Sequence, residues 1–276
     1  MQVRADATLA CHGCHKRHAA AADNRPGAMP PLLSHPGQTM PMPPLTIVER
    51  QNIDNGPWFA KLSPALRQDI LDRTVLRRLA DGELVAVRGG AAQEWCGVAL
   101  GAIRVSTVSL AGKQVTLTYV EPGTWFGDIA LFDGLPRTHD GHAHGATTLL
   151  AVRKPDFREL LSRHVELYDA LLRLNCRRLR LMFDALEDIN TRPLAARLAR
   201  QVLQLARRYG VEEDNGEVRI GLVLAQEDLA QLLGASRQRV NQELKALERE
   251  GALRVEPSRL IVLSRDKLMA LSEPMA

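Results

Sequence analysis

The chain has 276 residues, which suffices for about two domains. Apolar residues make up 45% of it, but no stretch approaches the ~18 consecutive apolar residues that cross a membrane, so we expect no membrane partner. The cysteines are too few and too scattered for a disulfide scaffold, and the start lacks an apolar signal segment, so a cytoplasmic location is expected. A net charge of +4 is compatible with a nucleic-acid partner without establishing one.

Residues 1–44 are rich in Ala, Pro, Gly and His and show neither a helical nor an alternating period. We expect a disordered tail, or an artefact of start-site assignment if translation begins at Met40 or Met42. The run Cys11-His-Gly-Cys14-His15 matches the attachment pattern of c-type haem, but covalent haem attachment usually follows export. No haem is therefore expected.

Residues 45–160 have the pattern of a small β domain preceded by a helix. A helical period runs from about Trp58 to Leu79, and short β-like runs follow up to Val152. Glycines punctuate these runs every ~8–12 residues, which is typical of an all-β barrel or roll. We expect a double-stranded β-roll of the jelly-roll type that acts as a sensor domain.

A long helix is predicted from about 155 to 190, and residues 161–192 are interpreted as a dimerisation helix. Its apolar positions recur in steps of three and four, which is typical of a coiled-coil seam. The expected interface residues of a homodimer are Leu172, Leu179, Met182, Leu186 and Ile189. The alternative is a core helix within one chain. Arg192-Pro193 ends the helix, because proline disfavours a helical residue before it.

Residues 193–276 are predicted to form a winged helix-turn-helix. Gly234 follows a first amphipathic helix where the chain must turn with a positive φ, which glycine adopts at little cost. Ser236 then provides an N-cap for a second helix. The buried stripe of that helix is expected at Val240, Leu244 and Leu247.

This stripe leaves Arg237, Gln238, Gln242 and Lys245 on the outer side of the second helix. Arginine reads guanine and glutamine reads adenine in the major groove, so double-stranded DNA is the expected partner. A β-hairpin wing follows and offers two arginines to phosphate. The predicted DNA-binding residues are Ser236, Arg237, Gln238, Gln242, Lys245, Arg254 and Arg259. The structural alternative is an ordinary helical hairpin with a solvated polar face, and a protein–protein adaptor is an alternative function.

Two motifs resemble those of the CRP/FNR family of bacterial transcription regulators. They are Gly127-Asp-Ile-Ala-Leu-Phe-Asp-Gly-Leu-Pro-Arg137-Thr138 and Leu233-Gly-Ala-Ser-Arg-Gln-Arg-Val-Asn-Gln-Glu-Leu244. The resemblance runs from about 58 to 264 and implies an α+β protein: a β-roll, a long dimerisation helix and a winged helix-turn-helix. It also implies a dimer that binds palindromic DNA and contacts RNA polymerase. By resemblance, Arg237, Gln238 and Gln242 occupy base-reading positions.

The first motif resembles the phosphate-binding cassette of cyclic-nucleotide domains. A short helix after Gly127 aims N–H groups at an anion, and Arg137 can grip a phosphate. The expected ligand residues are Gly127, Asp128, Arg137, Thr138 and Arg178. Family members that bind nucleotides usually have Glu where this chain has Asp128, and hydroxyls where it has Met182-Phe183. The sequence thus leaves open a cyclic nucleotide (cAMP or cGMP), another small ligand or none.

His139, His142 and His144 lie near Asp140 in a Gly-rich stretch, which raises the alternative of a metal-dependent, cupin-like roll enzyme. No separated fourth ligand and no known catalytic motif accompanies them, so a solvated His-rich loop, no metal and no catalytic residue are expected. The preferred interpretation is a sequence-specific DNA-binding regulator whose affinity for DNA responds to a signal in the roll.

Overall fold

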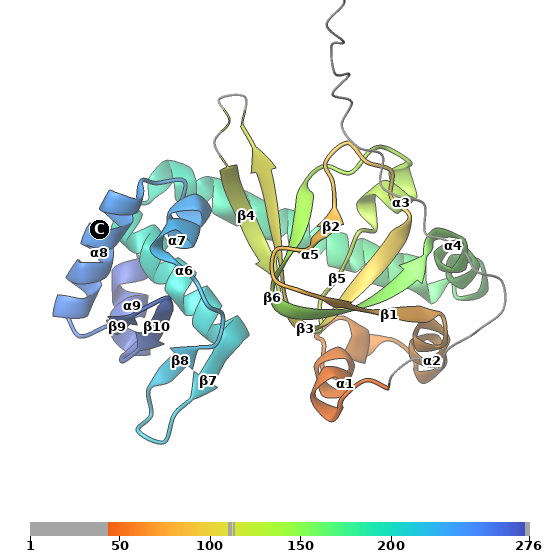
Figure 1. Ribbon diagram of the computed structural model, residues 1–276, viewed down its shortest axis with the longest axis horizontal. Coiled ribbons are helices and arrows are strands. Elements are labelled where there is room, and N and C mark those ends of the chain that lie inside the picture. The colour runs from red at the N-terminus through yellow and green to blue at the C-terminus, as the bar shows by residue number, and fades with distance from the viewer. Residues whose placement is uncertain (1–43, 110–111, 113, 274–276) are drawn as a thin grey trace, which may run out of the picture. The chain divides into compact units, whose positions relative to one another are not determined.

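The computed structural model describes residues 44–109, 112 and 114–273. The tail predicted over 1–44 therefore lies outside the described residues except for Pro44, and so does the Cys11-to-His15 motif. Two parts are named below. The roll runs from α1 to α4 and the head runs from α6 to α9, and α5 connects them. Figure 1 labels these elements.

The roll begins with helices, and its first strand begins earlier in the chain than the sequence analysis predicts. The first elements are α1 (Ile47–Asp54), the 3-10 helix η1 (Phe59–Lys61), α2 (Pro64–Asp72) and β1 (Thr74–Leu79). The helix predicted over 58–79 thus ends at Asp72, and the rest of that segment is a strand. The reason is non-local, because β1 pairs antiparallel with β6, with Thr74 opposite Val152.

The roll is built on antiparallel strands, which confirms the predicted β-roll. Its further elements are β2 (Leu84–Ala86), β3 (Glu94–Val108), β4 (Gln114–Val120), β5 (Trp125–Phe126), α3 (Ile129–Asp133), β6 (Asp140–Arg153) and α4 (Lys154–Arg163). The strand order is β1-β6-β3-β4, while β2 pairs with β6 and β5 with β3. Trp95 and Trp125 pack in the core with ring centroids 4.4 Å apart.

A buried carboxylate joins α1 to this sheet. Glu49 is 0% exposed, and it accepts hydrogen bonds from Arg78 and Thr148 at 2.7 Å and from the Thr46 N–H at 2.8 Å. Burial by itself raises the pKa of Glu49, but these hydrogen bonds outweigh it and lower that pKa to about 2. Because the folded pKa is depressed, the stabilisation is complete above pH about 4.5 and is lost as the pH falls toward 2.

We therefore expect Glu49→Gln to lower the free energy of unfolding by about 2–3 kcal/mol at pH 7 and by much less at pH 3. Urea unfolding at a series of pH values measures this difference. Asp54→Asn on the same helix is the control, because Asp54 forms an exposed ion pair with Arg50 and its loss should cost below about 0.5 kcal/mol. An equal loss for Glu49→Gln at both pH values contradicts the expectation.

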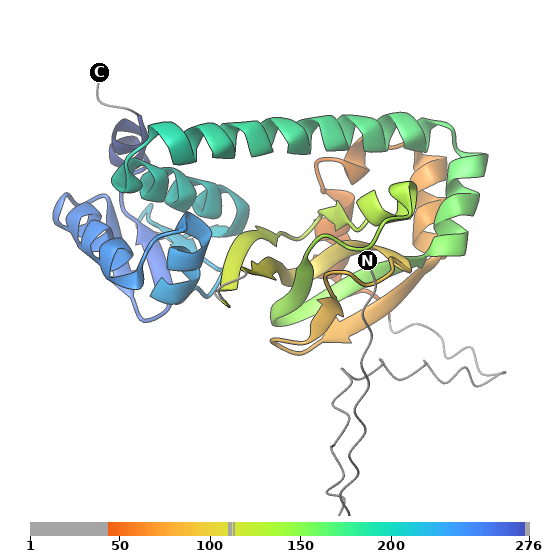
Figure 2. The same ribbon diagram turned by 90° about the horizontal axis from the view of Figure 1, so that it is seen from above.

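The long helix predicted over 155–190 is divided in two. α4 ends at Arg163, and α5 (Glu166–Thr191) begins after His164 and Val165. His164 leaves the helical region with φ −123° and ψ 87°, and its ring is 2.9 Å from Asp69 of α2, measured from Nε2 to Oδ2. This tertiary contact lies at the break. Figure 2 shows α5 running unbroken toward the head.

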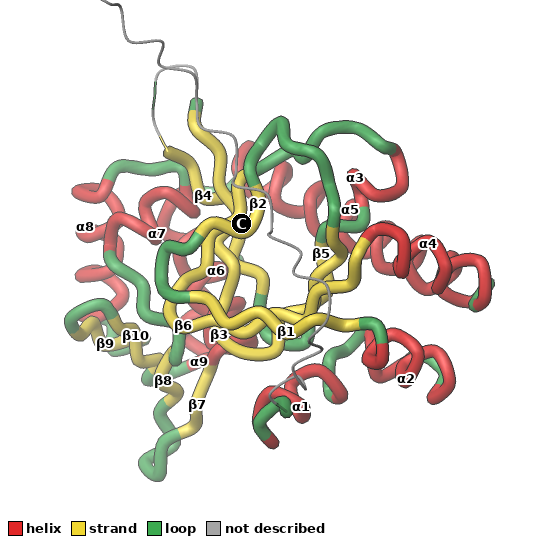
Figure 3. Tube along the Cα trace, turned by 45° about the vertical axis from the view of Figure 1, so that its right-hand side comes forward, coloured by secondary structure: helices red, strands yellow, loops and turns green. Residues whose placement is uncertain are grey.

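The head is a helical unit with a small antiparallel sheet. Its elements are α6 (Leu194–Tyr209), β7 (Gly210–Glu212), β8 (Val218–Ile220), α7 (Gln226–Leu233), α8 (Arg237–Arg249), β9 (Leu253–Glu256), β10 (Arg259–Val262) and α9 (Arg265–Ser272). The sheet order is β7-β8-β10-β9, so the segment after Tyr209 contributes a hairpin to the sheet (Figure 3). No described helix combines the length and apolar character that a membrane crossing requires.

Candidate DNA-binding surface and sensor site

The helix-turn-helix is formed by α7 and α8, and its local geometry follows from a few residues. Gly234 ends α7 with φ 62°, the left-handed conformation that glycine adopts at little cost. The Ser236 hydroxyl accepts a hydrogen bond from the Arg239 N–H at 3.3 Å, which confirms the predicted N-cap of α8. Val240 and Leu244 are buried in the head core, as predicted.

The opposite side of α8 is exposed and polar. The side chains of Arg237, Gln238, Gln242 and Lys245 all lie there. Among the described residues, none of these side chains has a hydrogen bond or an ion pair, so their donors remain available to a ligand. Because α8 is capped at its start and anchored by its apolar stripe, it presents these groups on a rigid element. Such an arrangement is suited to reading base edges in a major groove.

The wing is the hairpin of β9 and β10, and its two arginines differ. Its turn contains Ser258 with φ 55°, and the Leu224 N–H donates to the Ser258 carbonyl at 3.0 Å. Arg259 is exposed, whereas Arg254 donates to both carboxylate oxygens of Glu217 at 3.1 and 2.8 Å. A phosphate at Arg254 has to compete with this ion pair, so the role of Arg254 stays a prediction.

The structure adds polar residues to this surface that the sequence analysis missed. Arg239 is exposed in the first turn of α8, and Arg249 is exposed at its end. Gln226 Nε2 donates to Asn241 Oδ1 at 3.2 Å, which links the start of α7 to α8. The helical period alone could have revealed the two arginines. The link between Gln226 and Asn241 depends on how the two helices pack.

The cassette, Gly127 to Thr138, is bound to α5 through Asp128. Asp128 is 0% exposed, and Arg178 Nη1 donates to its two carboxylate oxygens at 2.9 and 3.1 Å. Asn175 Nδ2 donates to Oδ2 of Asp128 at 2.9 Å, and Arg178 Nη2 donates to the Trp125 carbonyl. The structure therefore brings Asp128 and Arg178 together as an ion pair. Asn175 of α5 also turns toward the cassette.

The phosphate end of the cassette has a different character. Gly127 has φ 95°, and a Cβ there would lie 3.1 Å from the Glu94 carbonyl and 3.5 Å from Arg137 Nη1, so glycine allows this close approach. Arg137 Nη2 donates to the Glu94 carbonyl at 3.2 Å. Thr138 is exposed, and its hydroxyl is 2.8 Å from Nδ1 of His139.

These contacts test how well a cyclic nucleotide fits. Arg137 and Thr138 have the donors that a phosphate requires. The carboxylate of Asp128 does not suit a ribose hydroxyl in this arrangement, because it is buried and its oxygens already bind Arg178 and Asn175. Met182 and Phe183 are exposed on α5 and have no hydrogen-bonding group for a base. Arg137 and Thr138 therefore offer donors to the phosphate half of the ligand, whereas Asp128, Met182 and Phe183 offer no free donor to its sugar and base in this arrangement.

The histidines lie in or next to a strand rather than in the solvated loop that the sequence predicts. His142 and His144 belong to β6, opposite Arg104 and Ala102 of β3. His144 Nε2 is 2.6 Å from the Val223 carbonyl. Pairing with β3 overrides the local glycines. Within 44–109, 112 and 114–273, no three His, Cys, Asp or Glu side chains are grouped as metal ligands.

The apolar residues predicted for a dimer seam are exposed along α5. They are Leu172, Leu179, Met182, Leu186 and Ile189, and each is at least half exposed. Phe183, which the sequence analysis did not assign to the interface, is exposed beside them. A row of large apolar side chains of this length is unusual on the surface of a monomer and typically marks an interaction site.

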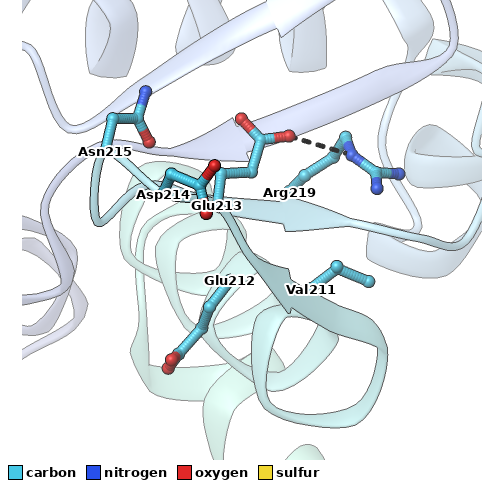
Figure 4. Close-up of a pocket in the computed structure, with 6 residues that line it drawn as sticks. All are labelled: Val211, Glu212, Glu213, Asp214, Asn215 and Arg219. Carbon is cyan, nitrogen blue, oxygen red and sulfur yellow. Dashed lines mark hydrogen bonds and ion pairs between the residues drawn. The ribbon is translucent and has the colours of Figure 1, made fainter.

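The β7–β8 hairpin forms an acidic surface on the head that the sequence analysis did not single out. A shallow groove there is lined by Val211, Glu212, Glu213, Asp214, Asn215 and Arg219 (Figure 4). Arg219 Nε is 3.0 Å from Glu213 Oε1, and Arg265 Nη2 is 3.7 Å from Glu212 Oε1, so two of the acids are paired. Asp214 is exposed, and the acidic character of this hairpin distinguishes it from the basic outer side of α8.

Comparisons with known proteins match both parts of the chain. A model of the cyclic nucleotide-binding domain matches residues 76–164, and a model of the Crp-like helix-turn-helix domain matches residues 196–271. A CRP-like cAMP-activated global transcriptional regulator from Mycobacterium tuberculosis is 33% identical over 173 residues, which are 61% of this chain and 75% of that protein.

Two proteins from Thermus thermophilus extend the match. A cyclic AMP receptor protein is 29% identical over 201 residues, which are 73% of this chain and 89% of that protein. A CRP-family transcriptional regulator of solved structure shares the fold with a TM-score of 0.61 at 24% identity, over 71% of this chain and 96% of that one. With both domains matched in the same order and a relative at this level of identity, the chain belongs to the CRP/FNR family of transcription regulators.

Proposed function

We propose that this regulator binds palindromic DNA as a homodimer, with α8 of each subunit in the major groove of one half-site. The observation that carries the proposal is the exposed polar side of α8, capped by Ser236 and free of intramolecular partners among the described residues. Half-sites about one helical turn apart suit two such helices related by a two-fold axis.

The exposed side of α8 supports a division of roles. Arg237 offers paired donors to guanine, and Gln238 and Gln242 suit adenine. Lys245 and Arg259 carry exposed charges that suit phosphates, which position a protein on DNA without reading its sequence. Arg254 is the weakest of the predicted contacts because Glu217 already binds it.

The exposed row on α5 supports the homodimer. A symmetric dimer places the same surface of both copies in contact, so each apolar side chain gains a partner from one interface. Leu172, Leu179 and Leu186 are spaced by seven residues, which matches the repeat of a two-helix seam. A single contact between two copies of α5 removes this apolar row from water in both chains.

The roll is proposed to be the sensor. Its candidate signals are a cyclic nucleotide and another small molecule. Binding of a signal in the cassette reaches α5 through Asp128 and Arg178 and so biases the arrangement of the heads. Calorimetry with cAMP and cGMP tests the nucleotide. If a nucleotide gives no heat of binding, or binds without changing the affinity for DNA, then it is not the signal.

We further propose a cytoplasmic, non-enzymatic role in which the protein contacts RNA polymerase. The support is family membership: the relatives named above are transcription regulators. Neither a roll enzyme nor an adaptor has comparable support.

Arg237→Ala tests the DNA-binding role directly. Duplexes selected from a random pool by the wild-type protein provide the specific site, and fluorescence anisotropy measures affinity. The variant should lose about 1–3 kcal/mol on the selected duplex and much less on random duplexes, because a base contact is removed. Arg158→Ala, an exposed arginine of α4, is the control. Failure to enrich any duplex, or an unchanged specific affinity for Arg237→Ala, contradicts the proposal.

A further inference from the structure

Strand β4 of the roll is hydrogen-bonded to the first helix of the helix-turn-helix. Thr116 is 1% exposed, and its hydroxyl donates to Gln231 Oε1 of α7 at 2.8 Å. While the contact is closed, a Thr116 hydroxyl without this acceptor is a buried polar group that lacks a partner, so the hydrogen bond favours the closed contact. It joins residues that are 115 positions apart in the chain.

Tyr119 continues the contact along the same strand. It is 3% exposed and belongs to one hydrophobic cluster with Ala102 of β3 and the core residues of the head. The His144 ring lies 4.9 Å from the Tyr119 ring, and His144 Nε2 is 2.6 Å from the Val223 carbonyl just before α7. Roll and head therefore share a packed core here as well as hydrogen bonds.

Charged groups border this contact. Glu121, directly after β4, is 3.4 Å from Arg208 of α6, measured between Oε2 and Nε. Burial raises the pKa of Glu121, and the positive charges of Arg208 and Arg207 oppose that rise. Burial also raises the pKa of Tyr119, and the negative charge of Asp228 on α7 adds to the effect.

The contact uses parts of the head that the exposed side of α8 does not need. Its head residues are Gln231 and Asp228 of α7, Arg208 of α6 and the Val223 carbonyl. The side chains of Arg237 and Gln242 remain exposed while the contact is formed. The contact therefore joins the head to the roll and leaves the exposed side of α8 open.

We propose that Thr116, Tyr119 and His144 are positioning residues for DNA binding, which hold the head at one orientation on the roll and so preorganise α8. The proposal rests on the DNA-binding role proposed above. A head that is already oriented has fewer orientations to lose on binding, so affinity rises without any new contact to DNA. The roll then supports DNA binding through β4 as well as through α5.

Thr116→Val tests this proposal because it keeps the shape and removes the hydroxyl. On the duplex selected by the wild-type protein, its affinity should fall about three- to tenfold, the range expected for one lost hydrogen bond. Thr116→Ser keeps the hydroxyl and should restore most of the affinity. The slope of affinity against salt should stay unchanged, because the number of phosphate contacts does not change.

Thr118→Val is the matched control, because its hydroxyl lies on the same strand and hydrogen-bonds only the neighbouring Tyr119 carbonyl among the described residues. Gln231→Met removes the acceptor from the other side and should reproduce the loss even if Thr116→Val folds poorly. Wild-type protein that selects no duplex overturns the DNA-binding role itself. Wild-type binding with unchanged or tighter binding by Thr116→Val and Gln231→Met overturns the positioning role alone.

Discussion

Replacing Arg178 with alanine is expected to lower the free energy of unfolding of the roll by about 3 kcal/mol or more. Asp128 is 0% exposed, and Arg178 is its ion-pair partner at 2.9 Å. A buried carboxylate without its cation has lost the interaction that compensates for its removal from water, so its desolvation penalty remains uncompensated. Among the described side chains, the donor that then remains on this carboxylate is the neutral amide of Asn175.

Urea unfolding followed by tryptophan fluorescence measures this effect in the roll specifically. All three tryptophans of the chain, Trp58, Trp95 and Trp125, pack together there. Arg173→Ala is the control, because Arg173 forms an exposed ion pair with Asp169 one turn earlier on α5 and its loss should leave the stability nearly unchanged. Equal stabilities of Arg178→Ala and Arg173→Ala speak against the buried ion pair.

The double variant Asp128→Asn with Arg178→Ala isolates the cause. An uncharged amide tolerates burial better than a carboxylate, so the second change should recover part of the lost stability. If the double variant is less stable than Arg178→Ala alone, the loss stems from packing of the arginine rather than from the unpaired charge.

Leu186→Glu is expected to convert the proposed dimer into monomers at micromolar concentration. Leu186 is 59% exposed within one chain, and the proposed dimer buries it in both copies. The change removes two apolar side chains from the seam and puts two like charges there, which should cost about 5 kcal/mol or more in association free energy. That corresponds to a Kd raised by more than about a thousandfold.

Sedimentation equilibrium distinguishes the two states, because one chain has a mass of 30.5 kDa and the dimer twice that. Loss of the dimer should also lower the affinity for a palindromic duplex, because two monomers then bind the two half-sites independently. Arg177→Glu is the control, as it introduces the same acid on an exposed part of α5 that lies away from Leu186 around the helix. If the Leu186→Glu protein stays dimeric, the proposal that α5 forms the dimer interface is wrong.

Local patterns were sufficient to predict the helix-turn-helix. Gly234 and Ser236 act through their own backbone and nearest turns, and the stripe of Val240 and Leu244 follows the helical period. The predicted roll was confirmed although β3 and β6 continue through Gly101 and Gly145, while Gly82 and Gly123 do lie in turns between strands. The assignment failed at 74–79, where pairing of β1 with β6 outweighs a helical period.

The candidate sensor site could be predicted only in part. The motif from Gly127 to Thr138 identified the cassette, but Asp128 and Arg178 are 50 positions apart and their ion pair is a tertiary contact. The same holds for Arg254, which the sequence assigned to phosphate and which the fold places against Glu217. A charged side chain binds whichever opposite charge the fold brings near.

The amino-acid sequence by itself determined the order of roll, long helix and head, and which side of α8 is polar, because caps, turns and periodicity act over a few residues. The tertiary structure alone decided that Asp128 binds α5, that His144 and Thr116 contact the head, and that the helical segment breaks after Arg163. These contacts join distant segments, and their energies depend on burial and distance, which only the folded chain defines.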